Sequence, residues 1–230
     1  GGGWSVSVPN VLSEKWVAAG STGVTLNVLR FTATTEEFAL TDLRLQTDAS
    51  GTSTAADYAK IYLYDGNTLI QSKVPSFVKD IEDFTFPTTG TGSFIIPKDG
   101  FKEMTIKADL AIIGANVPGK AGQLVGVDYD GTTNTTKNLA RGKESGSSVH
   151  SSTASDQTGN GVVYFRSVPT IARVGLPLTT LTSSNHVIYK FTVTADPAYE
   201  VAIHKFTFKV ATTGITAFTA AVPNFTLWNA

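Results

Sequence analysis

Apolar and polar residues alternate with a period of two along most of this chain. The segments 24–33 and 38–45 both alternate in this way, and so do 60–64 and 68–71 on either side of a turn at Gly66. Such alternation is typical of β-strands with one buried face. The last two segments predict a β-hairpin whose turn needs a positive φ near Gly66.

The same alternation predicts further strands, and no window of eleven or more residues shows the 3.6-residue apolar period of a helix. The additional strands are expected at 84–86, 92–96, 102–113, 123–129, 162–169, 187–193 and 203–210. Many short strands separated by turn signals predict an all-β chain of sandwich architecture. We expect almost no helix beyond a single turn, because Thr and Val oppose it.

The end of the chain repeats its beginning. The segment 30–34 returns at 190–194, and 61–65 returns at 225–229, with small changes of offset that loop insertions explain. Between them, the matched apolar positions are Leu40 with Ile203, Leu43 with Phe206, and Leu45 with Phe208. Three matches in one order predict a repeated module.

The repeat divides the chain into a first module over 1–167 and a partial second module over 168–230. The first copy continues well beyond Gly66, whereas the second copy ends directly after Asn229. We therefore expect the second module to be completed by a longer tandem array or by a neighbouring chain. The segment 131–161 is rich in Thr, Asn, Ser and Gly, and we interpret it as an exposed loop of the first module, with a flexible linker as the alternative.

Composition narrows the classes of function. Charged residues make up 16% of the chain, below the roughly 25% usual for soluble domains, and 18 Lys and Arg balance 19 Asp and Glu. No stretch concentrates one sign, which argues against nucleic acid as a partner. No segment approaches the roughly 20 apolar residues that span a bilayer. A Thr-, Ser- and Gly-rich chain without cysteine favours an extracellular, cell-surface protein.

Three segments together resemble a known family: 17–24, the strand 30–34 and the start of the hairpin at 61–66. They are similar to the Ig-like repeats of large bacterial cell-surface proteins, including S-layer-like and surface-filament proteins. The resemblance covers 17–130 and 170–230, and its motifs are core positions and a turn. It implies tandem Ig-like β-sandwich modules of structural or adhesive function, and it carries no catalytic residue over to this chain.

The best candidate for a metal site comprises Asp128, Asp130 and Asn134, and calcium is the cation that they would select. The pattern D-x-D-G-x-x-N supplies hard oxygen ligands at alternating positions, with a glycine for a sharp turn. In the register of a helical calcium loop, however, Gly126 and Lys137 stand where two major carboxylate ligands belong. This mismatch favours an ordinary Asp-Gly turn.

Other polar candidates are weaker. Asn134 fits the pattern of an N-glycosylation acceptor, and Asn224 fits it too but begins a predicted core strand. Asp80, Glu82 and Asp83 form an acidic cluster that we interpret as a solvated loop, with a shared cation as the alternative. The histidines show no ligand spacing and no nucleophile elbow is present, so the sequence predicts no enzyme.

The N-terminal residues alternate as a strand would and supply a candidate interface. Trp4, Val6 and Val8 would share one face, as a strand donated to the open edge of a neighbouring subunit requires. The other candidate interface residues, at the end of the second copy, are Phe225, Leu227 and Trp228. A head-to-tail contact of this kind generates an open filament or a lattice.

The sequence therefore predicts a structural subunit of an extracellular assembly, a surface layer or a surface filament. Its partners would be other copies of itself or further modules of the same protein. An adhesive or glycan-binding surface module is the alternative, because tryptophan and tyrosine rings stack on sugars. Core packing competes with that explanation for most of the rings.

Overall fold

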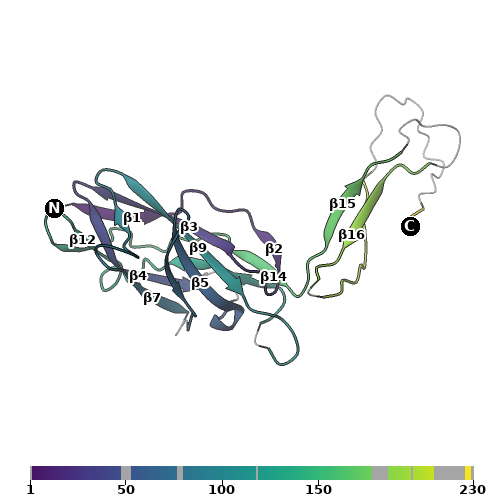
Figure 1. Cartoon of the computed structure of the whole chain (residues 1–230), viewed down its shortest axis with the longest axis horizontal. Coiled ribbons are helices and arrows are strands. Elements are labelled where there is room, and N and C mark those ends of the chain that lie inside the picture. Colours follow the sequence, from purple (N-terminus) through teal and green to yellow (C-terminus); the bar gives the residue numbers. More distant parts are fainter. Residues whose placement is uncertain are drawn as a thin grey trace.

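The computed structural model describes residues 2–47, 53–76, 80–117, 119–177, 186–197, 199–209 and 226–228. These residues form an all-β structure with one short 3₁₀ turn, η1 (Ala55–Asp57), and they contain no α-helix (Figure 1). The strands are β1 (Gly3–Ser7), β2 (Lys15–Ala18), β3 (Val24–Thr34), β4 (Phe38–Thr47), β5 (Tyr58–Asp65), β6 (Thr68–Lys73), β7 (Ile81–Thr85), β8 (Ile95–Ile96), β9 (Phe101–Leu110), β10 (Gln123–Val125), β11 (Val127–Tyr129), β12 (Leu139–Gly142), β13 (Ser148–His150), β14 (Val162–Phe165), β15 (Thr170–Val174) and β16 (Lys190–Thr194). The all-β prediction is confirmed.

Two antiparallel sheets enclose the main core. One has the order β1-β3-β9-β5-β6, and the other has the order β11-β4-β12-β13, with β7 and β8 also paired to β4. Side chains from both sheets join in a single apolar cluster that includes Phe31, Leu43, Ile61 and Ile106. This arrangement is consistent with a β-sandwich. A smaller sheet, β10-β14-β2, contains the parallel pair β14 and β2.

The period-two pattern of β3 decides which of its side chains enter the core. Leu29, Phe31 and Ala33 are fully buried, and the residues between them are half-buried. The register with β9 shifts between Thr25 and Asn27. This irregularity of the β-bulge type lets the polar side chain of Asn27 point inward beside apolar neighbours.

The hairpin predicted around Gly66 is confirmed. β5 and β6 pair antiparallel, and Gly66 has a φ of 57°. Leu63 is buried, while Tyr62 and Tyr64 lie on the opposite, outer face of β5. The ammonium groups of Lys60 and Lys107 lie over these two rings, so the outer face is a layer of aromatic and cationic side chains.

The single strand predicted at 123–129 is wrong. The chain breaks at Gly126 into β10 and β11, which belong to different sheets. At the break, the Gly126 carbonyl accepts a hydrogen bond of 2.5 Å from the buried Tyr58 hydroxyl instead of a neighbouring strand. One continuous run of alternating residues therefore supplies strands to two different sheets.

The interpretation of 131–161 as an exposed loop is also wrong. The segment contains β12, which pairs with β4, and β13, which pairs with β12. Asn138, Ala140 and Gly142 within it are buried. Backbone hydrogen bonds to β4 hold β12 in the sheet, and these bonds require no apolar side chains.

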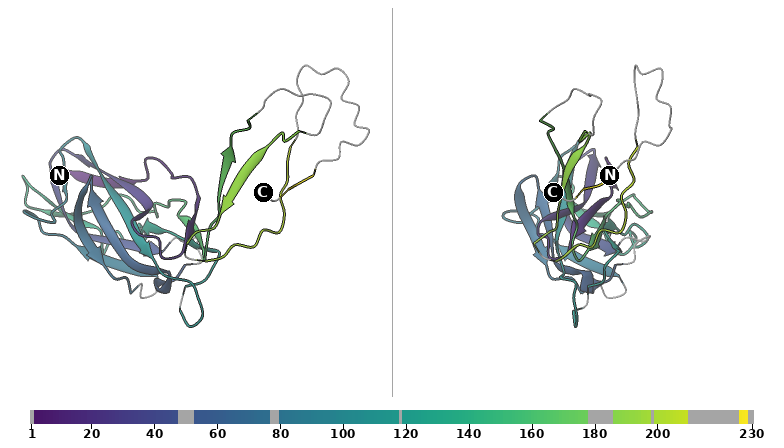
Figure 2. Two further views of the ribbon diagram at one scale, coloured as in Figure 1. Left: turned by 45° about the vertical axis from the view of Figure 1, so that its right-hand side comes forward. Right: turned by 90° about the vertical axis from the view of Figure 1, so that its right-hand side faces the viewer.

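The strands expected in the second copy form only in part. β16 covers 190–194, but 201–209 has no strand, and Val210 lies outside the described residues. β15 forms in a segment where no strand was predicted, and it pairs with β16 in a sheet of its own. Figures 1 and 2 show this strand pair beyond the β14 end of the sandwich.

Candidate functional site

Asp128, the first predicted calcium ligand, is a buried acceptor inside the sandwich. Its side chain is on β11, and Oδ1 accepts hydrogen bonds from Asn27 Nδ2 at 3.1 Å and from the Gly159 amide at 2.9 Å. A Cβ at position 159 would come within 2.9 Å of the Asn27 side chain. Glycine at this position therefore allows three distant segments to meet at one carboxylate.

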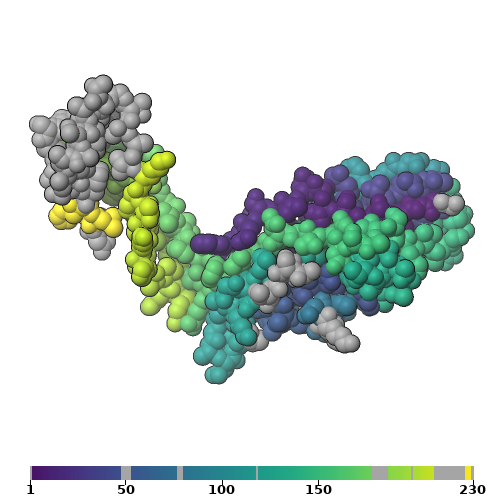
Figure 3. All heavy atoms as spheres, turned by 180° about the vertical axis from the view of Figure 1, so that it is seen from behind, coloured from purple at the N-terminus to yellow at the C-terminus, as the bar shows by residue number. Residues whose placement is uncertain are grey.

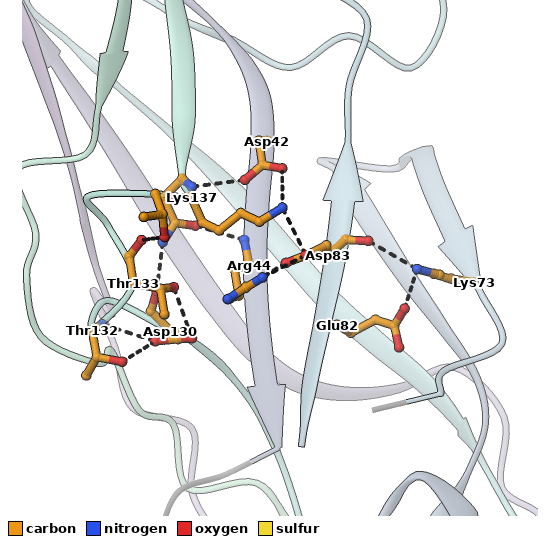
Figure 4. A network of polar contacts seen from close by, with 11 residues as sticks. Asp42, Arg44, Lys73, Glu82, Asp83, Asp130, Thr132, Thr133 and Lys137 are labelled. Carbon is orange, nitrogen blue, oxygen red and sulfur yellow. Dashed lines mark hydrogen bonds and ion pairs between the residues drawn. The ribbon is translucent and has the colours of Figure 1, made fainter. Parts of the chain in front are cut away.

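Asp130, the second predicted ligand, binds groups of its own loop. Its carboxylate accepts hydrogen bonds from the Thr132 amide at 3.0 Å, the Thr132 hydroxyl at 2.7 Å and the Thr133 hydroxyl at 3.1 Å (Figure 4). A Cβ at Gly131 would overlap the backbone of Ser155. The glycine of the D-x-D-G pattern thus permits a close approach of two backbones.

Asn134, the third predicted ligand, lies in yet another environment. Its Nδ2 donates to the Ser151 carbonyl at 3.0 Å, so a glycan on this nitrogen would displace that hydrogen bond. Asp128, Asp130 and Asn134 are thus engaged with three different sets of partners. Among the described residues, no three His, Asp or Glu side chains group closely enough to hold a metal ion.

The N-terminal strand, predicted as a donor to a neighbouring subunit, is built into the core of its own sandwich. Trp4 is 2% exposed and Val6 is 4% exposed, while Val8 packs against the same core. Along the edge that β3 does not occupy, the Val6 amide and carbonyl both bond to the Thr153 hydroxyl, and the Trp4 carbonyl accepts from the Ser152 amide at 2.9 Å. Release of β1 would break these bonds and expose a tryptophan, so the sequence-based donor is not available here.

The remaining aromatic candidates divide by exposure. Tyr129 is fully buried, and Trp16 on β2 is 67% exposed with its ring in edge contact with Phe165 at 5.6 Å between centroids. The Arg166 guanidinium stacks on the Tyr199 ring at 3.3 Å from its centroid. Trp16 and Phe165 therefore form an aromatic pair on the sandwich, in which Trp16 is exposed and Phe165 is half-buried.

A network of charges covers the sheet around β4 and β7 (Figure 4). Arg44 donates two hydrogen bonds to Asp83, at 2.6 and 2.9 Å, and Lys137 Nζ lies 3.0 Å from the same carboxylate. Lys73 contacts the buried carboxylate of Glu82. The interpretation of the acidic cluster as a solvated loop is wrong for Glu82 and Asp83, which lie on β7 and are each paired with a cation. Asp80 lies in an exposed turn just before the strand.

The Asp83 network predicts a pH-dependent contribution to stability. Hydrogen bonds from Arg44, followed by those from Lys137, lower the pKa of Asp83 from 3.8 to about 2. Because the folded-state pKa is depressed, the stabilisation is complete above pH 4 and is lost as the pH falls toward 2. We expect Asp83→Asn to lower the free energy of unfolding by about 1 kcal/mol at pH 7, since a third of the side chain is exposed and water screens the pair.

Urea denaturation of the wild type and Asp83→Asn at pH 7, 5, 4 and 3 measures this contribution. The difference between the two proteins should shrink between pH 4 and pH 3, and Glu14→Gln, an exposed carboxylate elsewhere, serves as the control. A difference that is constant down to pH 3 would contradict the ion-pair explanation.

The sequence repeat extends to strand pairing. β1 pairs with β3 so that Trp4 is opposite Ala33, and β15 pairs with β16 so that Ile171 is opposite Val193. The two partner positions, Ala33 and Val193, are equivalent in the sequence repeat. β15 therefore occupies on β16 the place that β1 occupies on β3.

The described apolar residues of the second copy are half-buried or exposed, whereas their counterparts in the first copy are buried. Four of them form the C-terminal aromatic cluster, defined as Tyr189, Phe191, Phe206 and Phe208, whose ring centroids lie 5.1 to 6.3 Å apart in contacting pairs. The counterpart of Phe208 in the first copy is Leu45, which is fully buried, whereas Phe208 is 50% exposed. Leu227 and Trp228 are also exposed, and Phe225 lies outside the described residues.

Figure 3 shows the yellow-green segment that contains β16 standing apart from the bulk of the sandwich. The strand pair and the C-terminal aromatic cluster together form the best candidate for a functional surface, because a large exposed apolar patch marks an interaction site. The described part of the chain contains no helix with the length and hydropathy needed to cross a membrane.

Comparison with known proteins assigns no family to this chain. No protein-family pattern matches the chain, and no curated protein is detectably similar to it. The functional argument therefore rests on the geometry of the chain itself.

Proposed function

We propose that this chain is a structural subunit of an extracellular assembly, a surface layer or surface filament, built from tandem Ig-like β-sandwich modules. Its partners in this proposal are other copies of the chain or further modules of the same protein. The resemblance of its core positions to Ig-like surface repeats and its weakly charged, Thr- and Ser-rich composition support the proposal. The metal candidates add nothing to it, because their oxygens serve the fold.

The observation that carries the proposal is the contrast between the two copies of the repeat. The same apolar positions are buried in a core in the first copy, whereas among the described residues of the second copy they are half-buried or exposed, including the C-terminal aromatic cluster. Apolar surface of this kind is stabilised by burial against a partner, at roughly 25 cal/mol per Å². A subunit that presents such a surface at one end is suited to head-to-tail contacts, which propagate into filaments or lattices.

Light scattering coupled to size-exclusion chromatography, with negative-stain imaging of the same samples, tests the proposal. We expect species far above the 24.3 kDa of one chain, with a size that increases with concentration and with filaments or sheets in the images. Dispersed particles of 24.3 kDa at every concentration would overturn it.

A glycan-binding surface module is the second candidate, and the exposed ring of Trp16, in contact with Phe165, favours it. Aromatic rings held at a surface in this way can stack on a sugar face. Saturable binding of a glycan by the monomer, lost in Trp16→Ala, would support this function in place of assembly.

A further inference from the structure

β15 occupies one edge of the strand β16, and the described residues leave the other edge unpaired. β15 pairs with it from Thr170 to Val174, in the register that β1 uses on β3. No other described residue pairs with β16, and the neighbouring segment 201–209 has no strand. The edge of β16 opposite β15 thus presents backbone donors and acceptors that a further strand can pair with.

The first copy shows which kind of strand fits this edge. On β3, the edge opposite β1 is taken by β9, which pairs antiparallel from Val24 to Thr32. β9 alternates apolar and polar residues, and its Met104 and Ile106 are fully buried. Because β15 stands in the place of β1, the open edge of β16 corresponds to the place of β9.

Charge defines the register of such a strand. Arg30 of β3 is opposite Glu103 of β9, and the guanidinium and carboxylate are 2.7 Å apart. The residue equivalent to Arg30 in the second copy is Lys190, which is exposed at the start of β16. A strand on the open edge would satisfy this position with an acidic side chain opposite Lys190.

The N-terminal strand does not meet these requirements. Its place on the second copy is already filled by β15, and its own backbone is bonded to β3 and to Ser152 and Thr153. The hypothesis that the strand of Trp4, Val6 and Val8 is donated to a neighbouring subunit is therefore replaced by one with a different donor strand.

We propose that the open edge of β16 is an acceptor site for an antiparallel β-strand supplied by another chain. The donor strand has the chemistry of β9: alternating apolar side chains that cover the C-terminal aromatic cluster, and an acidic residue opposite Lys190. This inference deepens the proposed function and rests on it, since it names the contact through which one subunit would join the next.

A peptide that copies β9, residues 101–110 with the sequence FKEMTIKADL, is the probe. We expect it to bind the full-length chain saturably, as measured by fluorescence anisotropy of a labelled peptide. Hydrogen exchange should slow at the amides of 190–194 when the peptide is bound and remain unchanged at 24–32. The second region reports whether the peptide instead replaces β9 in the sandwich.

Exchanging the charges at Glu103 of the peptide and Lys190 of the protein tests the register in which the peptide binds. A peptide with Glu103→Lys should bind about tenfold more weakly, because it places a like charge opposite Lys190. The protein variant Lys190→Glu should restore binding of that altered peptide and weaken binding of the original one. A peptide of the same composition with its alternation scrambled is the control for non-specific hydrophobic binding.

Several results would overturn the acceptor site: no saturable binding, protection at 24–32 in place of 190–194, or no response to the charge exchange. Self-association that protects 190–194 in the absence of peptide should be inhibited by excess β9 peptide, and association that the peptide does not inhibit would also overturn the site. Polymer formation without peptide binding would leave the proposed function in place and reject only this site. Peptide binding by a chain that stays monomeric at every concentration would reject the assembly and leave the acceptor edge.

Discussion

Replacing Asp128 by Ala is expected to lower the free energy of unfolding by about 3 kcal/mol, a large part of the stability of a typical domain. The carboxylate is 1% exposed and accepts hydrogen bonds from Asn27 and from the Gly159 amide. Its removal leaves the buried Gly159 amide without this acceptor and opens space between β3 and β11. Thermal and urea denaturation should show a decrease in Tm of about 6 to 12 °C.

The conservative variant Asp128→Asn retains an acceptor oxygen and should lose less than half as much stability as Asp128→Ala. Repeating both measurements with calcium and with a chelator separates the structural role from the metal hypothesis. The structural role predicts the same Tm for the wild type in both conditions. A wild-type Tm that rises with calcium, together with no such rise in Asp128→Ala, would restore the calcium site and contradict this account.

Making the C-terminal aromatic cluster polar is expected to abolish assembly without unfolding the sandwich. Tyr189 is 49% exposed and Phe208 is 50% exposed, so neither side chain is needed by the first core. If a partner buries them, each loses about 1 to 2 kcal/mol of contact when replaced by Ser. The double variant Tyr189→Ser, Phe208→Ser should therefore associate about a hundredfold more weakly than the wild type.

Leu69→Ser is the matched control, because Leu69 is 45% exposed on β6 of the sandwich. It should leave both assembly and the urea midpoint unchanged. Sedimentation velocity over a range of concentrations measures the association of all three proteins, and denaturation confirms that the sandwich is intact. Equal loss of assembly in the control and in the double variant would show that the cluster is not the contact.

The local signals of the sequence were sufficient for individual strands. Alternation located β3, β4, β5 and β6, and Gly66 has the positive φ that its turn was expected to need. These features depend on neighbours two to four residues away, which the sequence displays directly. Alternation did not locate the strands in 131–161, because β12 joins the sheet by backbone pairing with β4.

The candidate site could not be found in the same way. The D-x-D-G-x-x-N pattern indicated a metal loop, but Asp128 bonds to Asn27, which is 101 residues away in the chain. Likewise, the alternation of Trp4, Val6 and Val8 is common to a donated strand and to a core strand. Which of the two it is depends on Thr153 and on β3, which lie far away in sequence.

The sequence alone determined that this protein is built of β-strands, that its apolar residues alternate, and that its beginning is repeated near its end. The first two properties follow from the short period of apolar residues, and the third follows from direct comparison of two segments. Only the tertiary structure decided which strand edges are occupied, which copy of the repeat closes a core, and which carboxylates serve the fold. Edge pairing and burial are set by contacts between distant residues, and a pattern that is the same on every strand does not specify them.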